Sequence, residues 1–224
     1  MSVLFAESLP ISEHHVAAFS KPARTFTGDF YFTHRNGDRL WFALGDVAGK
    51  GLPAAVIMAM IQEELEHRIT SCASARCEPS VTMQRLHQFM RPLMPSNRFA
   101  TIVIGSLHDD GTLTIANAGH CPPMIVRRDG TIEQIEPTGP VAGILPKSSW
   151  RSTTLRLESG DAIFLFSDGL LEAESEHGEE YGYGRIERAV TRDDETMIDD
   201  VLRDVRSFSP RFEDDVTLLS ITAS

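Results

Sequence analysis

DFYFTHRNGDRLWFALGD, residues 29–46, is the stretch that decides the fold. Two runs rich in β-forming residues flank Asn36-Gly37, a dipeptide that two-residue hairpin turns favour. The stretch therefore predicts paired strands near 29–34 and 38–44. Because a two-residue turn can join only antiparallel strands, the sheet that starts here is predicted to be antiparallel.

Two further Asx-Gly dipeptides repeat this pattern, each between runs rich in β-formers. Three more runs of this kind have no such turn and are predicted as additional strands. The hairpins pair 101–107 with 112–117 around Asp110-Gly111 and 123–127 with 131–135 around Asp129-Gly130, and the additional strands are 153–157, 162–167 and 216–222.

Three segments between the strands have helical patterns. Residues 52–69 are apolar nearly all round at first and then amphipathic, and Pro53 suits a first turn. Residues 80–91 and 195–206 each place apolar side chains on one face. This order predicts an α+β fold in which two antiparallel sheets pack face to face as a central sandwich flanked by helices. No flexible linker divides the chain, so one domain over 1–224 is predicted.

Composition excludes several classes of function. A formal net charge of −11 opposes nucleic-acid binding, which needs a basic surface. No apolar run approaches the roughly 18 residues of a membrane span, and the N-terminus does not resemble a signal peptide. The odd set of Cys72, Cys77 and Cys121 predicts reduced thiols and a cytoplasmic setting, and it lacks the four ligands of a structural zinc site.

Aspartates recur at strand ends, usually beside glycine. Gathered carboxylates repel one another unless a cation neutralises them, and adjacent glycines let the backbone approach a ligand. Oxygen ligands without histidine or cysteine favour magnesium or manganese over zinc. The alternative is that each aspartate is a solvated turn residue, and periodicity does not show that they converge. The sites are Asp29 after Gly28, Asp46 after Gly45, Asp168 before Gly169, and the pair Asp214-Asp215.

Two other motifs suggest chemistry that their details do not support. GDVAGKG at 45–51 is not a phosphate-binding P-loop, because Gly51 stands where that motif requires serine or threonine. His120 in NAGHCPP suggests acid–base catalysis, but a lone histidine after a strand is more often structural.

Six motifs in order resemble the PPM-type phosphatases of the stage II sporulation protein E branch, which include bacterial phosphatases of anti-anti-sigma proteins. The resemblance runs over residues 3–222. The motifs are GDFY at 28–31, GDVAGKG at 45–51, RFATIVIG at 98–105, NAGHCPP at 117–123, FSDGLLEA at 166–173 and DDVTLL at 214–219.

The resemblance implies a β-sandwich flanked by helices and a centre of two divalent cations, Mn²⁺ or Mg²⁺. By motif match, Asp46 would bridge both metals and the backbone carbonyl of Val47 would bind one of them. Asp168 and Asp214 would complete the shell of the other metal, and Asp29 would act on a metal directly or through water.

Some positions depart from the family pattern or stay open. Phe32 stands where many members have a second carboxylate, and Ala48 stands where eukaryotic relatives have a histidine. Arg24 is a candidate for the arginine that contacts phosphate in those relatives; the alternative is a surface arginine. Between Asp214 and Asp215, the first is favoured as the ligand because the family uses the leading aspartate of this motif.

The resemblance implies a protein serine/threonine phosphatase that acts through metal-activated water on a phosphorylated STAS-type antagonist in sigma-factor regulation. The alternatives are a non-catalytic phosphoprotein-binding module and a hydrolase of small phosphate esters. Because few residues precede the predicted catalytic core, a separate activator protein or a homodimer is expected to control activity. The helices 52–69 and 80–91 are expected to act as the switch.

Overall fold

The structure is a computed structural model that forms two compact units, each with its own antiparallel sheet. Unit 1 comprises Met1–Thr25, Pro123–Ile135 and Leu157–Ser224, and unit 2 comprises Phe26–Pro122 and Glu136–Arg156. The residues described are 9–11, 14–23, 25–49, 51–72, 77–94, 98–190 and 196–224.

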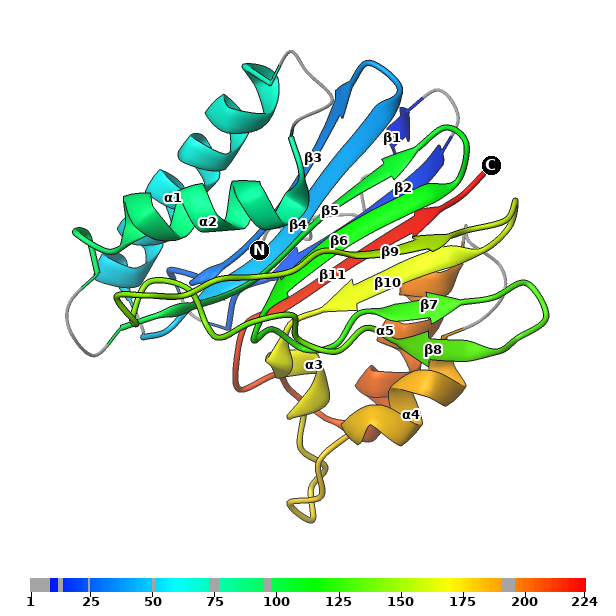
Figure 1. Cartoon of the computed structure of the whole chain (residues 1–224). Coiled ribbons are helices and arrows are strands. Elements are labelled where there is room, and N and C mark those ends of the chain that lie inside the picture. The colour runs from blue at the N-terminus through cyan, green and yellow to red at the C-terminus, as the bar shows by residue number, and fades with distance from the viewer. Residues whose placement is uncertain are drawn as a thin grey trace. The chain divides into compact units, whose positions relative to one another are not determined.

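The sheet of unit 2 has the order β3-β4-β5-β6-β9, and each strand is antiparallel to its neighbours (Figure 1). The hairpins predicted around Asn36-Gly37 and Asp110-Gly111 are confirmed as β3–β4 and β5–β6, but Asn36 pairs with Arg39, so the two-residue turn of the first is Gly37-Asp38. The strands are β3 (Asp29–Asn36), β4 (Arg39–Val47), β5 (Ala100–His108), β6 (Thr112–Ala118) and β9 (Thr153–Arg156).

Two helices pack on this sheet (Figure 1). Helix α1 (Leu52–Thr70) contacts β3 and β4, and helix α2 (Pro79–Met90) contacts β5 and β6. Pro53 lies in the first turn of α1, as predicted. Leu65 of α1 and Leu86 of α2 are fully buried and share one hydrophobic core with Trp41 of β4. Burying these apolar faces is what holds both helices on the sheet.

The sheet of unit 1 has the order β1-β2-β11-β10-β7-β8. The third predicted hairpin, at Asp129-Gly130, is confirmed as β7–β8. Helix α5 contacts β2 and β11. The elements are β1 (Leu9–Ile11), β2 (His14–Lys21), β7 (Met124–Val126), β8 (Ile132–Gln134), β10 (Ala162–Phe166), α3 (Asp168–Leu171), α4 (Gly182–Ala189), α5 (Met197–Phe208) and β11 (Val216–Thr222).

The predicted α+β class with two antiparallel sheets and helices is confirmed, but the sequence did not predict β2 or α4. Residues 15–21 of strand β2 pair with β11, close to the other end of the chain. No local turn marks such a pairing, so a search for hairpin signals does not find it. Among the described residues, no helix combines the length and apolar character that crossing a membrane requires.

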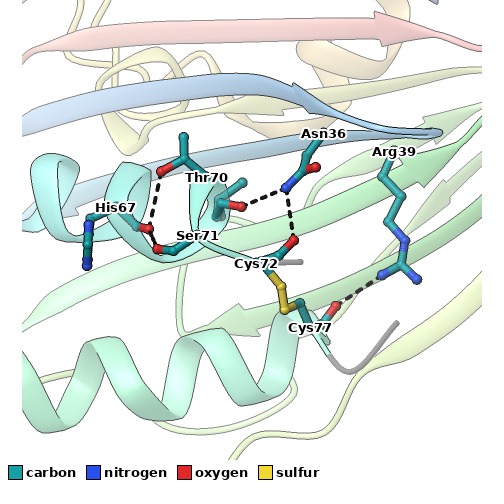
Figure 2. The surroundings of a disulfide bond; sticks show 8 residues. Asn36, Arg39, His67, Thr70, Ser71, Cys72 and Cys77 are labelled. Carbon is teal, nitrogen blue, oxygen red and sulfur yellow. Dashed lines mark hydrogen bonds between the residues drawn. A yellow bond between two sulfur atoms is a disulfide. The ribbon is translucent and has the colours of Figure 1, made fainter. Parts of the chain in front are cut away.

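The prediction of reduced thiols is wrong for Cys72 and Cys77, which form a disulfide (Figure 2). Their Cα atoms lie 6.3 Å apart, within the range that a disulfide spans. Asn36 Nδ2 donates to the carbonyl oxygen of Cys72 at 3.1 Å, and Arg39 Nη1 donates to that of Cys77 at 3.2 Å. Because the β3–β4 hairpin holds both cysteine backbones, tertiary structure brings together two thiols whose sequence spacing carries no signal.

Candidate functional site

The first acidic pair lies at one end of the β3–β4 ladder. Asp29 opens β3, Asp46 is the second-last residue of β4, and the two are direct partners in the antiparallel register. Direct partners project from the same face of a sheet, with Cβ atoms about 5 Å apart. Asp29 is only 4% exposed. Two carboxylates so close together repel each other unless a cation or a proton lies between them.

Gly28 makes room for two oxygen atoms beside this pair. A Cβ at Gly28 would lie 2.8 Å from Asp46 Oδ1 and 2.9 Å from the carbonyl oxygen of Val47, closer than real Cβ atoms come. The N–H of Val47 donates to the Gly28 carbonyl at 3.2 Å, which holds the two backbones together. A carboxylate oxygen and a carbonyl oxygen therefore converge over Gly28. Hard cations such as Mg²⁺ and Mn²⁺ prefer such oxygen donors, so these residues fit the implied metal.

The second acidic group lies in unit 1, where the end of β10 meets the start of β11. Asp168 is the first residue of α3, directly after β10. Ser167 Oγ accepts a hydrogen bond from the Thr217 N–H at 2.9 Å and donates to the Asp215 carbonyl oxygen at 3.2 Å. A Cβ at Gly169 would lie 2.1 Å from that carbonyl oxygen. Only glycine permits this approach, so the Asp-Gly dipeptide here is set by packing of backbone on backbone.

Asp214 and Asp215 differ in what their carboxylates contact. Asp215 Oδ1 accepts a hydrogen bond from the Ala23 N–H at 2.7 Å, which ties the segment after β2 to the start of β11. Asp214 Oδ1 accepts a local bond from the Asp215 N–H at 3.0 Å. Burial and the nearby Asp214 carboxylate raise the pKa of Asp168. Asp168 and Asp214 thus form the second pair of mutually repelling charges, whereas the Ala23 bond gives Asp215 a structural role.

We expect Asp168→Asn to stabilise the metal-free protein at neutral pH. The folded-state pKa of Asp168 is raised above its unfolded value, so the folded state binds the proton more tightly. Its contribution to stability is therefore greatest below the unfolded pKa and is lost as pH rises through the folded pKa. At neutral pH the charge, which is partly desolvated and repelled by the Asp214 carboxylate, destabilises the fold, and the uncharged amide removes that cost.

Thermal unfolding of both proteins in EDTA measures this effect, and Asp199→Asn on the exposed face of α5 serves as the control. The wild type should gain about 2.7 kcal/mol from a cation at 100 times its dissociation constant, and Asp168→Asn should lose most of this gain. A variant that is less stable than the wild type in EDTA would contradict the prediction.

Two other candidate residues are Arg24 and His120, of which His120 contacts Thr101, the β5 partner of Asp46. Arg24 lies outside the described residues. His120 is buried, and its Nδ1 is 2.9 Å from Thr101 Oγ1. The Asn117 side chain accepts from the His120 N–H at 2.8 Å and donates to its carbonyl oxygen at 3.1 Å, so His120 takes part in holding the turn after β6. Within the described part of the chain, no three histidine, cysteine, aspartate or glutamate side chains form a group that could hold a metal.

Arg98 is a residue of unit 2 to which the sequence assigned no role. Its guanidinium lies against Gly49, in the turn that follows β4. The signal that could have found it is its place at the start of the motif RFATIVIG, where a single charged residue precedes an apolar strand.

A cavity of about 560 Å³ in unit 1 is lined by none of the aspartates that are candidate metal ligands. Arg127 is at its centre, with Nε donating to Glu133 at 2.7 Å and Nη1 donating to Asp161 at 2.9 Å. Asp161 also accepts from the Arg128 N–H at 2.9 Å. The charged side chains that line the cavity pair with one another and form a structural ion-pair network. The cavity is therefore not the candidate site.

Comparison with known proteins identifies the family. Residues 36–224 match the family described as Stage II sporulation protein E (SpoIIE). The chain belongs to the SpoIIE family. This is a family of PP2C-type, metal-dependent serine phosphatases. The family predicted from the sequence is therefore confirmed.

Two curated relatives of this SpoIIE-family chain are longer than it is. Phosphoserine phosphatase RsbU of Bacillus subtilis (strain 168) is 32% identical over 165 residues, which cover 73% of this chain and 48% of RsbU. Protein IcfG of Synechocystis sp. (strain ATCC 27184 / PCC 6803 / Kazusa) is 27% identical over 215 residues, covering 82% of this chain and 33% of IcfG. The chain thus spans about half of one relative and a third of the other.

Solved structures show the same fold. The crystal structure of the RsbU and RsbW domains of Rv1364c from Mycobacterium tuberculosis matches with a TM-score of 0.78 and 26% identity, over 94% of this chain and 61% of that one. RsbX in complex with magnesium matches with a TM-score of 0.76 and 16% identity, over 98% of this chain and all of that one (100%). The SpoIIE-family chain therefore has a PP2C-like α+β fold.

Proposed function

We propose that this SpoIIE-family chain is a single-domain protein phosphatase that removes phosphate from phosphoserine or phosphothreonine on a regulatory protein. The observation that carries the proposal is the convergence of Asp46 Oδ1 and the Val47 carbonyl oxygen over Gly28, with Asp29 directly opposite on the neighbouring strand. A binding module without catalysis would have no need for such a crowded set of oxygens, which carries a cost in charge repulsion.

The proposal assigns two divalent cations, Mn²⁺ or Mg²⁺, to Asp29, Asp46, the Val47 carbonyl, Asp168 and Asp214, as the sequence resemblance implies. When bound, the cations supply an activated water and neutralise charge on the phosphoryl oxygens. The chain's own contribution is positioning. The β3–β4 register holds Asp29 and Asp46 face to face, and the backbone contact at Gly169 holds the loop of Asp214 in place. Attack by water needs no nucleophilic side chain.

The proposed substrate is a phosphorylated anti-anti-sigma protein of the STAS type. Support comes from the likeness to the phosphoserine phosphatase RsbU over 73% of this chain. The proposal therefore places the enzyme in the signal transduction that controls sigma factors under stress, with the cytoplasm as its setting.

The proposed regulator is a separate activator protein or a second copy of the chain. Leu52, Val56 and Met60 of α1 are 56%, 50% and 37% exposed. Residues four apart lie on one face of a helix, so these side chains form an apolar stripe on α1. Such exposed apolar surface suits a protein partner. Because α1 follows the turn after Asp46, a partner that binds α1 would change the position of Asp46.

We expect hydrolysis of a phosphorylated STAS-domain protein that requires Mn²⁺ or Mg²⁺ and is lost in EDTA. The measurement is phosphate release from that protein and from p-nitrophenyl phosphate, over a range of enzyme concentrations. If neither substrate reacts with any divalent cation, the enzymatic proposal fails. If only the small ester reacts, the protein-substrate proposal fails. Activity that is independent of enzyme concentration and of added partners would contradict the proposed regulation.

A further inference from the structure

The loop that follows the first acidic pair contains a buried cationic donor. Arg98 Nη1 is buried and has no hydrogen-bond partner among the described residues. Buried donors are almost always paired, because leaving one unpaired costs the free energy of its lost hydration. A guanidinium offers five N–H donors and no acceptor, so only an acceptor atom can satisfy this one. The structure therefore holds a positive group that is suited to an oxygen ligand.

The position of Arg98 places this donor against the turn that follows Asp46 and Val47. The Phe99 carbonyl oxygen accepts a hydrogen bond from the Ala48 N–H at 2.9 Å, which continues the β4–β5 pairing beyond Val47. Arg98 thus lies alongside the turn that begins directly after the two oxygens over Gly28. All of these residues belong to unit 2.

Gly49 shapes the space in which the guanidinium lies. A Cβ at Gly49 would be 3.1 Å from Arg98 Cζ, 3.3 Å from Nε and 3.4 Å from Nη1. The three similar distances show that the planar group faces the turn. Gly49 also has a φ of 116°, which side chains rarely adopt. Any other residue at position 49 would strain the turn and contact the guanidinium too closely. The position of the Arg98 guanidinium therefore depends on glycine at position 49.

We propose that Arg98 binds the phosphoryl group of the substrate through its guanidinium. This inference rests on the proposed phosphatase function and names the residue that holds the phosphate. A planar guanidinium offers parallel N–H donors that match two oxygens of a phosphoryl group, and such charge-assisted bonds are among the strongest in proteins. Arg98 thereby takes the role that the sequence resemblance suggested for Arg24.

The test is calorimetric binding of inorganic phosphate to the full magnesium-loaded chain. Arg98→Ala should weaken phosphate binding by about 10- to 100-fold, the usual cost of losing charge-assisted hydrogen bonds. Arg98→Lys keeps the charge without the planar donors and should show an intermediate loss. Arg151→Ala, an exposed arginine in the same unit, is the matched control and should bind as the wild type does.

The magnesium affinity and the thermal midpoint of unfolding are measured for each variant as well. A merely structural role of Arg98 would change these two quantities and leave the phosphate affinity unchanged. Wild-type phosphate affinity in both Arg98 variants overturns the proposal, and so does a loss seen in Arg24→Ala alone. If Arg98→Ala does not fold, Arg98→Lys decides by the same criterion. A wild type that binds phosphate but hydrolyses no ester refutes the proposed function, and the variants still decide the role of Arg98. A wild type that does not bind phosphate overturns that role.

Discussion

Asp46→Asn is expected to lower kcat/KM for cation-dependent hydrolysis by more than about 100-fold, since even residues that only support a metal ligand cost 10- to 100-fold when replaced. The amide has the same shape as the carboxylate but no charge, so it cannot neutralise a divalent cation. The fold should tolerate the change, because the uncharged amide would no longer repel Asp29, the direct partner of this position across the β3–β4 ladder.

Steady-state kinetics and calorimetric titration of Mn²⁺ measure this prediction together. Asp38→Asn is the matched control, because Asp38 lies in the turn at the opposite end of the same hairpin and its side chain is 73% exposed. The control should keep both activity and cation affinity. Cation affinity in Asp46→Asn equal to that of the wild type would refute the assignment of Asp46 as a ligand.

Gly169→Ala is expected to destabilise the fold by about 1–3 kcal/mol, the usual cost of forcing extra volume into a packed site. The new Cβ would lie 2.1 Å from the carbonyl oxygen and 2.9 Å from the carbonyl carbon of Asp215. Backbone atoms cannot rotate away as the end of a side chain can. The start of β11 must therefore move, and Asp214 moves with it, so cation-dependent activity should fall as well.

Urea unfolding in EDTA measures the loss of stability, and the Mn²⁺ dependence of turnover measures the displacement of Asp214. Gly184→Ala is the control, since Gly184 lies within α4 and its Cβ would meet nothing closer than Arg188 Nη1 at 3.7 Å. An alanine inside a helix should raise stability by about 0.5–1 kcal/mol. Equal stability of Gly169→Ala and the wild type would show that the backbone contact at Asp215 is not as close as the structure has it.

Local chemistry explains which parts of the fold could be predicted. Each Asx-Gly hairpin depends on the conformational preferences of two residues, so it can be recognised without any knowledge of the rest of the chain. The β3–β4 hairpin belongs to this class, although Asn36 pairs with Arg39 and the turn residues are Gly37-Asp38; a turn centred on Asn36-Gly37 would have placed Leu44, and not Asp46, opposite Asp29. The contact between Asp215 and Ala23 does not, since the two residues are far apart in the chain.

The sequence by itself determined the antiparallel hairpins, the α+β class, the family and the motifs that carry the candidate ligands. Tertiary structure alone decided the pairing of β2 with β11, the Cys72–Cys77 disulfide and the position of Arg98 against Gly49. The physical reason is the range of the interactions. The backbone preferences that form a turn involve neighbouring residues, so they can be recognised from adjacent residues in the sequence. Contacts between distant segments depend on shape and hydrogen bonding, which appear only once the chain has folded.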